Sequence, residues 1–204
     1  MQIAKSVVLA SKSPRRIHLL NLIGISPKVI PADIPEDFNT SLSAAENAMH
    51  LAREKAKAIA PQCEDALLVG ADTIVVLGDI LLAKPEDAAD ARRMLQLLSG
   101  KTHTVITGFT ILDSSTGEYV SDFESTAVTF RDLPTEEIDE YVSGGSPMDK
   151  AGAYGIQDDY GAVFVTRIEG CFYNVVGFPL SKFYVTLEKF QVHLKEQRTY
   201  VENN

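Results

Sequence analysis

The chain has 204 residues, of which 45% are hydrophobic and 23% charged, values that suit one substantial globular domain. A formal net charge of −9 argues against a partner that is a nucleic-acid polymer, because proteins that bind such polymers usually carry a basic surface. No apolar run approaches the length of a membrane helix, and the N-terminus lacks the features of a signal peptide. The two cysteines match no metal or redox spacing, so we expect a cytoplasmic protein without a membrane partner.

Residues 7–24 form the most informative stretch of the chain. The apolar residues 7–9 predict a buried strand. Ser13 is a typical N-cap, Pro14 suits the first position of a helix, and Gly24 ends the helical pattern. Arg15 and Arg16 therefore fall in the first turn, where the helix dipole favours anions over cations. The arginines are either solvated or hold a phosphate at the helix start, and we favour the phosphate.

A second helix is predicted over residues 43–60. Ser43 and Glu46 form a capping box, and Pro61 follows the last turn. Lys55 lies inside the apolar arc of this helix, so it must either extend to water or meet an anion. Both outcomes remain open from the sequence. The short strand candidate at 28–30 and the loop at 31–37, which contains Glu36, come before it, and we expect the loop to be solvated.

Residues 66–69 predict a buried strand that runs into the segment 70–73, and residues 74–82 predict a hairpin that turns at Gly78 and Asp79. Asp72 is the one charge among about a dozen mostly apolar residues. It is either a satisfied turn aspartate or a functional carboxylate at a strand end. Pro85 keeps Lys84 extended, so we expect the ammonium group of Lys84 to project from the end of the hairpin.

The rest of the chain alternates between helices and strands. The pattern predicts helices from Asp87 to Gly100, from a cap at Thr135 to Gly144, and from Gly177 onward. Strands are expected at 105–112, in a segment that ends near Phe130, and at 162–168. The long loop at 146–157 is typical of a functional segment. We therefore predict a single α/β domain with a mixed sheet over residues 1–197, followed by a polar, frayed tail at 198–204.

The polar residues at these strand ends and helix starts are those needed to bind a nucleoside triphosphate with a divalent metal. Cations neutralise phosphates, carboxylates hold a metal, and neutral groups contact a base edge. No Walker loop is present, and no Ser/His or Cys/His pair suggests a covalent nucleophile. The candidates are the cations Arg15, Arg16, Lys55 and Lys84, the carboxylates Glu36 and Asp72, and the neutral residues Ser11, Thr73 and Gln157.

Five ordered motifs resemble the signature of the Maf family of nucleoside triphosphate pyrophosphatases. They are Leu9-Ala10-Ser11-Lys12-Ser13-Pro14-Arg15-Arg16, Gly70-Ala71-Asp72-Thr73, Lys84-Pro85, Leu98-Ser99-Gly100 with His103, and the run from Asp149 to Gln157. The last motif resembles the branch that prefers dTTP and UTP. The resemblance spans about residues 7–190. It implies an elongated mixed β-sheet flanked by helices in two lobes with a central cleft, usually in a homodimer.

The resemblance also implies a reaction, in which water attacks the α-phosphorus of a nucleoside triphosphate and pyrophosphate leaves. Asp72 matches the proposed proton acceptor of the family, and Lys55 and Lys84 match its catalytic lysines. Glu36 and Asp72 match the carboxylates expected to hold the metal cofactor, Mg or Mn. The substrate-binding matches are Ser11, Arg15, Arg16, Thr73 and Gln157, of which Arg15, Thr73 and Gln157 correspond to positions linked to base choice.

Two other functions remain as alternatives. One is a pyrophosphatase acting on 7-methyl-GTP or purine triphosphates in the same scaffold, which the motif at 149–157 disfavours. The other is a nucleotide-binding regulator of septum formation, which would bind without turnover. The chain departs from the family at Asp158-Asp159-Tyr160, where a glycine is more usual. We expect the two added carboxylates to weaken triphosphate affinity by repulsion.

Overall fold

The computed structural model describes residues 3–157 and 160–202 as an α/β molecule built on one seven-stranded mixed sheet. The strands are β1 (Ser6–Leu9), β2 (Lys28–Val29), β3 (Ala66–Leu77), β4 (Ile80–Leu82), β5 (Thr102–Asp113), β6 (Tyr119–Phe130) and β7 (Val165–Glu169). The helices are α1 (Pro14–Leu22), α2 (Ala44–Ile59), α3 (Ala88–Leu98), α4 (Thr135–Ser143), α5 (Phe172–Val176) and α6 (Leu180–Glu202). Short 3-10 segments are η1 (Ala60–Gln62), η2 (Ser146–Asp149), η3 (Ala151–Ala153) and η4 (Tyr160–Phe164).

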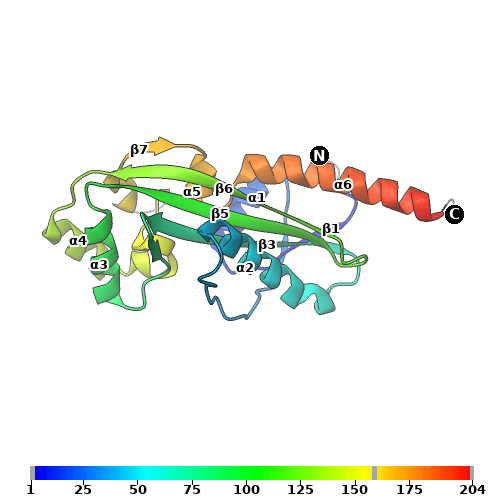
Figure 1. Ribbon diagram of the computed structural model, residues 1–204, viewed down its shortest axis with the longest axis horizontal. Helices are drawn as coiled ribbons and strands as arrows, with labels where there is room; N and C mark the ends of the chain where they lie inside the picture. Colours follow the sequence, from blue (N-terminus) through cyan, green and yellow to red (C-terminus); the bar gives the residue numbers. More distant parts are fainter. Residues whose placement is uncertain (1–2, 158–159, 203–204) are drawn as a thin grey trace.

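The sheet has the order β2-β1-β3-β5-β6-β7, with β4 paired to β3 outside this path. β1 runs parallel to both β2 and β3, whereas β3, β5, β6 and β7 form an antiparallel series. The three twelve-residue strands β3, β5 and β6 run along the long axis of the molecule (Figure 1). The predicted elongated mixed sheet is therefore confirmed.

We call the end of the sheet that carries α1, α2 and α6 the first lobe. Here helices cover both faces of the sheet. On one face α2 packs over β3 and β5, and its Ala56 and Ile59 join a core with Leu68. On the other face α1 and α6 enclose a second core, which includes Val69 of β3 and Phe109 of β5. A Cβ on Gly70 would lie 1.9 Å from the carbonyl oxygen of Ala52, so glycine at this position is what lets α2 approach β3.

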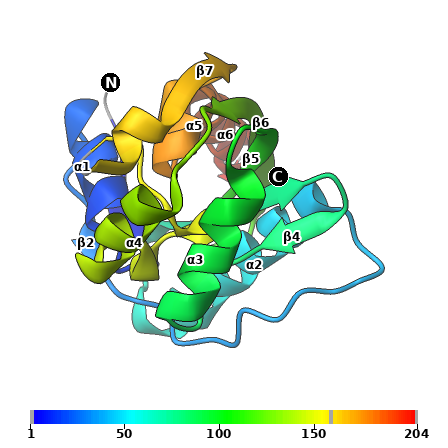
Figure 2. The ribbon, with the colours of Figure 1, turned by 90° about the vertical axis from the view of Figure 1, so that its left-hand side faces the viewer.

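The second lobe lies at the other end of the sheet, where α3 and α4 face the viewer in Figure 2. Its core combines residues of both helices with Val75 of β3, Val105 of β5 and Tyr154. The long strands β3 and β5 thus contribute to the cores of both lobes. On the face that carries Val69 and Val75, the polar pair Thr73 and Thr107 lies between the two cores.

Most of the predicted helix starts are confirmed. The side chain of Ser13 caps α1 ahead of Pro14, Ser43 and Glu46 form the complete capping box of α2, and Asp87 caps α3. The hairpin between β3 and β4 also turns where expected, with Leu77 paired to Ile80.

Four details differ from the sequence predictions. Asp72 lies in the middle of β3 rather than in a turn or at a strand end, because the strand continues through the Gly-Ala-Asp-Thr segment. The N-cap of α4 is Pro134, and Thr135 is the first helical residue. The strand expected at 162–168 begins at Val165, because residues 160–164 form a 3-10 segment. The backbone of α6 continues to Glu202, so residues 198–202 of the expected tail are helical.

Residues 203–204 of that tail lie outside the described residues. Among the described helices, none combines the length and the apolar composition that crossing a membrane would require.

Candidate functional site

A cleft of about 450 Å³ lies between the two lobes, along an open stretch of the edge of β3. β1 pairs with β3 only as far as Val69, and β4 pairs with it only from Val75 onward. Within the described part of the chain, the intervening residues of β3 therefore have no neighbouring strand on this side. Because successive side chains of a strand point to opposite faces, Asp72 and Thr73 enter the cleft from opposite faces of the sheet.

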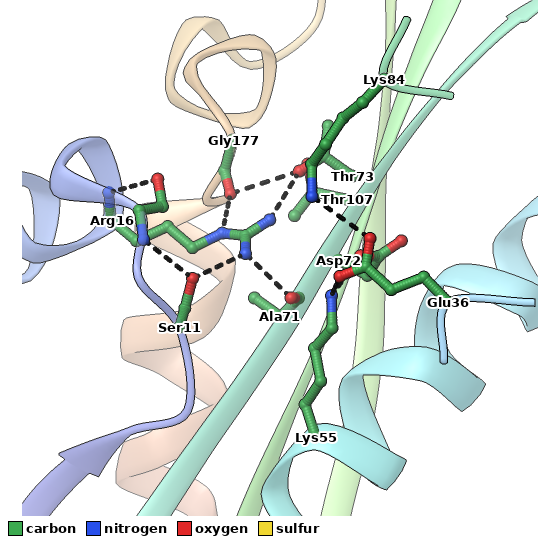
Figure 3. A network of polar contacts seen from close by, with 11 residues as sticks. Ser11, Arg16, Glu36, Lys55, Ala71, Asp72, Thr73, Lys84, Thr107 and Gly177 are labelled. Atoms are coloured by element: carbon green, nitrogen blue, oxygen red, sulfur yellow. Dashed lines mark hydrogen bonds and ion pairs between the residues drawn. The ribbon is translucent and has the colours of Figure 1, made fainter. Parts of the chain in front are cut away.

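Charged residues gather on the Asp72 face of the cleft. The Nζ atom of Lys55, carried by α2, lies 2.6 Å from a carboxylate oxygen of Asp72 and 2.6 Å from one of Glu36 (Figure 3). Lys55 and Asp72 are buried, with 6% and 7% of their surfaces exposed. Lys84 lies 3.2 Å from the other carboxylate oxygen of Glu36. Lys55 thus meets an anion, which decides the question that the sequence left open.

The two lysines also set the charge state of Glu36. Partial burial alone would raise the pKa of its carboxyl group. The hydrogen bond and charge of Lys55, supported by Lys84, outweigh this effect and lower the pKa of Glu36 to about 2. Glu36 is therefore ionised at neutral pH. It is exposed, as expected for a solvated acidic loop, and in addition it contacts both lysines.

Arg16 organises the opposite face of β3. Its guanidinium Nε donates to the carbonyl oxygen of Gly177 at 2.9 Å, and Nη1 donates to Ser11 Oγ at 3.1 Å and to the carbonyl oxygen of Ala71 at 2.9 Å (Figure 3). Nη2 donates to Thr73 Oγ1 at 3.0 Å. Burial lowers the pKa of this guanidinium, and the nearby charge of Asp72 acts in the opposite direction. Arg16 therefore ties three separate segments together at the back of the cleft.

The hydroxyl of Thr73 continues this network into the sheet. Thr73 Oγ1 lies 3.0 Å from Oγ1 of Thr107, its cross-strand partner on β5, and Thr107 Oγ1 donates to the carbonyl oxygen of Asn174 at 3.1 Å. Thr107 and Asn174 are fully buried. The side-chain amide of Asn174 in turn donates to the carbonyl oxygen of Val105 and to Thr126 Oγ1, both at 2.9 Å. Thr73 is thereby held from behind by fully buried groups.

The segment from Asp149 to Gln157 closes the cleft from the second lobe. Asp149 accepts a hydrogen bond from Arg15 Nη1 at 2.9 Å, which joins α1 to this segment. Gly152 has a φ of +70°, and a Cβ at this position would lie 3.1 Å from the side chain of Val75, so glycine suits both the turn and the packing. Ala153 also has a positive φ, of 62°, a strained conformation of the kind found near functional sites.

Tyr154 lines the cleft and is fixed from behind by His103. Its hydroxyl lies 2.8 Å from His103 Nε2, and the two rings meet edge to face. Burial lowers the pKa of His103 to about 4, so the imidazole is neutral at neutral pH. The neutral residues Thr73, Tyr154 and Gln157, together with Val75 and Val105, give this part of the cleft a weakly polar lining that suits an aromatic base.

All nine predicted site residues line this one cleft. They are Ser11, Arg15, Arg16, Glu36, Lys55, Asp72, Thr73, Lys84 and Gln157. Sequence reasoning missed Asp149, the partner of Arg15, and the buried residues Thr107 and Asn174. Of these two, Thr107 could have been indicated by a prediction of strand register, which places it opposite Thr73. Asp158 and Asp159, whose effect on affinity was predicted, lie outside the described residues.

The carboxylates Asp72 and Glu36 are the groups that could hold a divalent metal. Each has an oxygen 2.6 Å from the same lysine nitrogen, so these oxygens are at most twice that distance apart. Within residues 3–157 and 160–202, no three His, Cys, Asp or Glu side chains gather into a complete metal site. Mg²⁺ typically takes one or two carboxylates and completes its shell with substrate phosphates and water, so the two carboxylates fit such an ion.

The cleft thus combines a buried carboxylate, several cations and a weakly polar pocket. A carboxylate at such a position can accept a proton from water, and the cations can bind the phosphates of a nucleotide. This combination fits cleavage of a phosphoanhydride by water.

Comparison with known proteins places the chain in a family. Residues 6–190 match the family described as Maf-like protein. The chain is 48% identical over 192 residues to a dTTP/UTP pyrophosphatase of Alkaliphilus oremlandii, covering 93% of this chain and 99% of that protein. It is 43% identical to one of Caldicellulosiruptor saccharolyticus, with 91% of this chain and 94% of that protein covered. With most of its length matched in this way, the chain belongs to the Maf family.

Proposed function

We propose that this protein is a nucleoside triphosphate pyrophosphatase that hydrolyses dTTP and UTP, with modified forms of these pyrimidine nucleotides included in its substrate class. The observation that carries the proposal is the contact between Asp72 and Lys55 at the open edge of β3, inside a cleft lined by further cations. The names of the relatives, dTTP/UTP pyrophosphatase, support the choice of base.

In the proposed reaction, the oxygen of a water molecule bonds to the α-phosphorus as the bond from this phosphorus to the oxygen bridging to the β-phosphate breaks. Pyrophosphate leaves with the bridging oxygen, and the nucleoside monophosphate remains. The carboxylate of Asp72 accepts the proton of the attacking water. Lys55 lies against that carboxylate and compensates its charge, and Lys84 reaches the cleft beside Glu36 to stabilise charge that develops on the phosphates.

The proposed cofactor is a divalent metal cation, Mg²⁺ or Mn²⁺, with Glu36 and Asp72 as its protein ligands. Two carboxylates beside a phosphate-binding cleft support this choice, since such an ion usually shares its shell between carboxylates and substrate phosphates. When bound, the cation would neutralise phosphate charge and polarise the reacting centre. Lys55 contacts both carboxylates, so it would have to share them with the ion.

Base choice is proposed to lie with Arg15, Thr73 and Gln157, in line with the family resemblance. All three line the cleft. Ser11 and Arg16 belong to the same proposed substrate site, although the guanidinium of Arg16 is directed at protein acceptors. We further propose that the protein works in the cytoplasm as a homodimer that removes unwanted nucleotides. The two free cysteines support a reducing compartment, and the family resemblance supports the dimer.

The test is pyrophosphate release from a panel of canonical NTPs and dNTPs, with 7-methyl-GTP and ITP, in the presence of Mg²⁺, Mn²⁺ or EDTA. We expect metal-dependent release from dTTP and UTP and little release from purine nucleotides. Preferential release from 7-methyl-GTP or ITP would replace the pyrimidine assignment with the purine one. Nucleotide binding without release from any member of the panel would favour a regulator and contradict the proposal.

A further inference from the structure

The cations of the cleft differ in how far the protein already uses them. Six line it, namely Lys12, Arg15, Arg16, Lys55, Lys84 and Lys150. Arg15 pairs with Asp149, Lys55 with Asp72 and Glu36, and Lys84 with Glu36. Arg16 makes four hydrogen bonds to the protein, and Lys150 contacts Asp149 and Ser146. Among the described residues, these five are engaged and Lys12 makes no such contact.

The position of Lys12 suits a phosphate group. It is exposed and lies in the turn between β1 and α1, directly before the N-cap Ser13. The first turn of the nine-residue helix α1 contains no acidic residue, so the helix dipole favours an anion there. Its amide groups contribute little, because Pro14 has no N–H and the N–H of Arg16 donates to Ser13 Oγ. An anion held there would meet the ammonium group of Lys12 without breaking an existing ion pair.

The direction of the substrate decides which phosphate that is. Asp72 and Lys55 mark the reacting α-phosphorus in the proposed function, and the weakly polar lining around Tyr154 suits the base. The turn that contains Ser11 and Lys12 also lines the cleft, and Lys12 is the one of its six cations that makes no ion pair or hydrogen bond within the described residues. The phosphates beyond the α-phosphorus therefore extend toward this turn.

We infer that Lys12 binds the terminal phosphate of the substrate and thereby favours nucleoside triphosphates over shorter nucleotides. This inference rests on the proposed function and adds a substrate-binding residue to it. Because the terminal phosphate is remote from the bond that breaks, Lys12 contacts it equally in the ground state and in the transition state. Such uniform binding changes KM and leaves kcat nearly constant.

The experiment compares wild type with Lys12→Gln, Lys12→Arg and the control Lys101→Gln, which removes an exposed lysine that does not line the cleft. For Lys12→Gln we expect KM for dTTP and the inhibition constant of pyrophosphate to rise about fivefold, the size expected for one exposed charge pair. The value of kcat for dTTP and the inhibition constant of dTMP should stay within about twofold of the wild-type values. Lys12→Arg keeps the charge and stays close to wild type.

Three outcomes would overturn the inference. In Lys12→Gln, KM for dTTP and the inhibition constant of pyrophosphate could stay unchanged, or the inhibition constant of dTMP could rise as much as that of pyrophosphate. The third outcome is that Lys101→Gln shows the same changes as Lys12→Gln. The binding of pyrophosphate to wild type and Lys12→Gln, measured by calorimetry, gives a readout that needs no turnover. A wild-type protein that hydrolyses no nucleotide would refute the proposed function, while the loss or retention of pyrophosphate binding in Lys12→Gln would still decide the role of Lys12.

Discussion

Asp72 and Thr73 are neighbours in β3, yet the two faces of the sheet on which they lie are built in different ways. On the Asp72 face, full charges contact one another, and the outer members Glu36 and Lys84 have side chains that are 41% and 55% exposed. On the Thr73 face, one buried arginine and a series of neutral groups form hydrogen bonds with one another.

Side chains on the Asp72 face of the cleft can exchange one ionic partner for another, whereas those on the Thr73 face cannot easily exchange their hydrogen-bond partners. The single ammonium group of Lys55 contacts two carboxylates, so an incoming cation or phosphate can replace one contact without leaving a charge unpaired. On the other face, moving Arg16 would remove a donor from the carbonyl oxygens of Gly177 and Ala71. The Asp72 face is suited to chemistry and the Thr73 face to holding the geometry of the cleft.

The largest expected effect is on the charged face. Asp72→Asn removes the proton acceptor while keeping the shape of the side chain, so we expect kcat for dTTP to fall by about a thousandfold or more. Nucleotide binding, measured by calorimetry in the presence of metal, should remain within about tenfold of wild type. Near-full activity of Asp72→Asn would contradict the role of Asp72, and a matched loss of binding would assign it to substrate binding instead.

The sequence predicted the local parts of the fold and the membership of the site well. The capping box at Ser43, the cap at Ser13 and the hairpin turn at Gly78 depend on interactions over a few residues, so their residue patterns suffice. Lys55 was recognised as unusual because helical periodicity places it on the buried face of α2. Its two carboxylate partners could not be derived from that periodicity.

Contacts between distant segments account for what the sequence did not predict. Arg16 and Gly177 are separated by 161 positions in the chain, and Thr107 and Asn174 by 67. Asp72 was expected near a turn because Gly70 and Thr73 interrupt an apolar run. The interruption instead reflects packing, because Gly70 leaves room for α2 and Asp72 meets the lysine that α2 carries.

The packing of α2 provides the next test of the comparison. Gly70→Ala would place a methyl group 1.9 Å from the carbonyl oxygen of Ala52, and this backbone has to move. We expect a loss of about 2–3 kcal/mol in the free energy of unfolding, measured by urea denaturation. The atoms nearest this methyl group belong to Ala52 and Ala56 of α2, and Lys55 lies between these two residues in the sequence. Moving this turn of α2 would also move Lys55, so activity should fall as well.

Gly144→Ala is the matched control for this change. Gly144 has no strained φ, and the nearest atom to an added Cβ is a backbone oxygen at 3.4 Å. Its free energy of unfolding should stay within about 0.5 kcal/mol of wild type. Equal stabilities of the two alanine variants would show that α2 is not held at close range by Gly70.

Arg16→Lys tests the opposite face of β3. Lysine keeps the charge but cannot reproduce the planar set of donors that reaches Gly177, Ala71 and Thr73 together. We expect a loss of about 1–3 kcal/mol in the free energy of unfolding, because buried acceptors lose their donors. Arg15→Lys, made at the more exposed neighbour, should cost less than about 1 kcal/mol. Equal losses in the two variants would argue against a special structural role for Arg16.

The smallest effect is expected at Glu36 and depends on pH. Its pKa is lowered from 4.5 to about 2 in the folded protein, so its ionised form stabilises the fold above pH 4.5. This stabilisation disappears as the pH falls from about 4.5 toward 2. Because the Glu36 side chain is 41% exposed, solvent screening limits the contribution to about 0.5–1 kcal/mol.

Urea denaturation of wild type and Glu36→Gln at pH 7, 5 and 3 measures this contribution as a difference, which cancels the titration of the other carboxylates. We expect wild type to be the more stable protein at pH 7, and the difference in free energy of unfolding between the two proteins to be smaller at pH 3. The corresponding difference between wild type and Arg16→Lys should change less over the same pH range. The acceptors of Arg16 are carbonyl and hydroxyl oxygens, which do not titrate there. If both differences changed equally with pH, the distinction between a face of contacting charges and a face where one arginine meets only uncharged acceptors would be wrong.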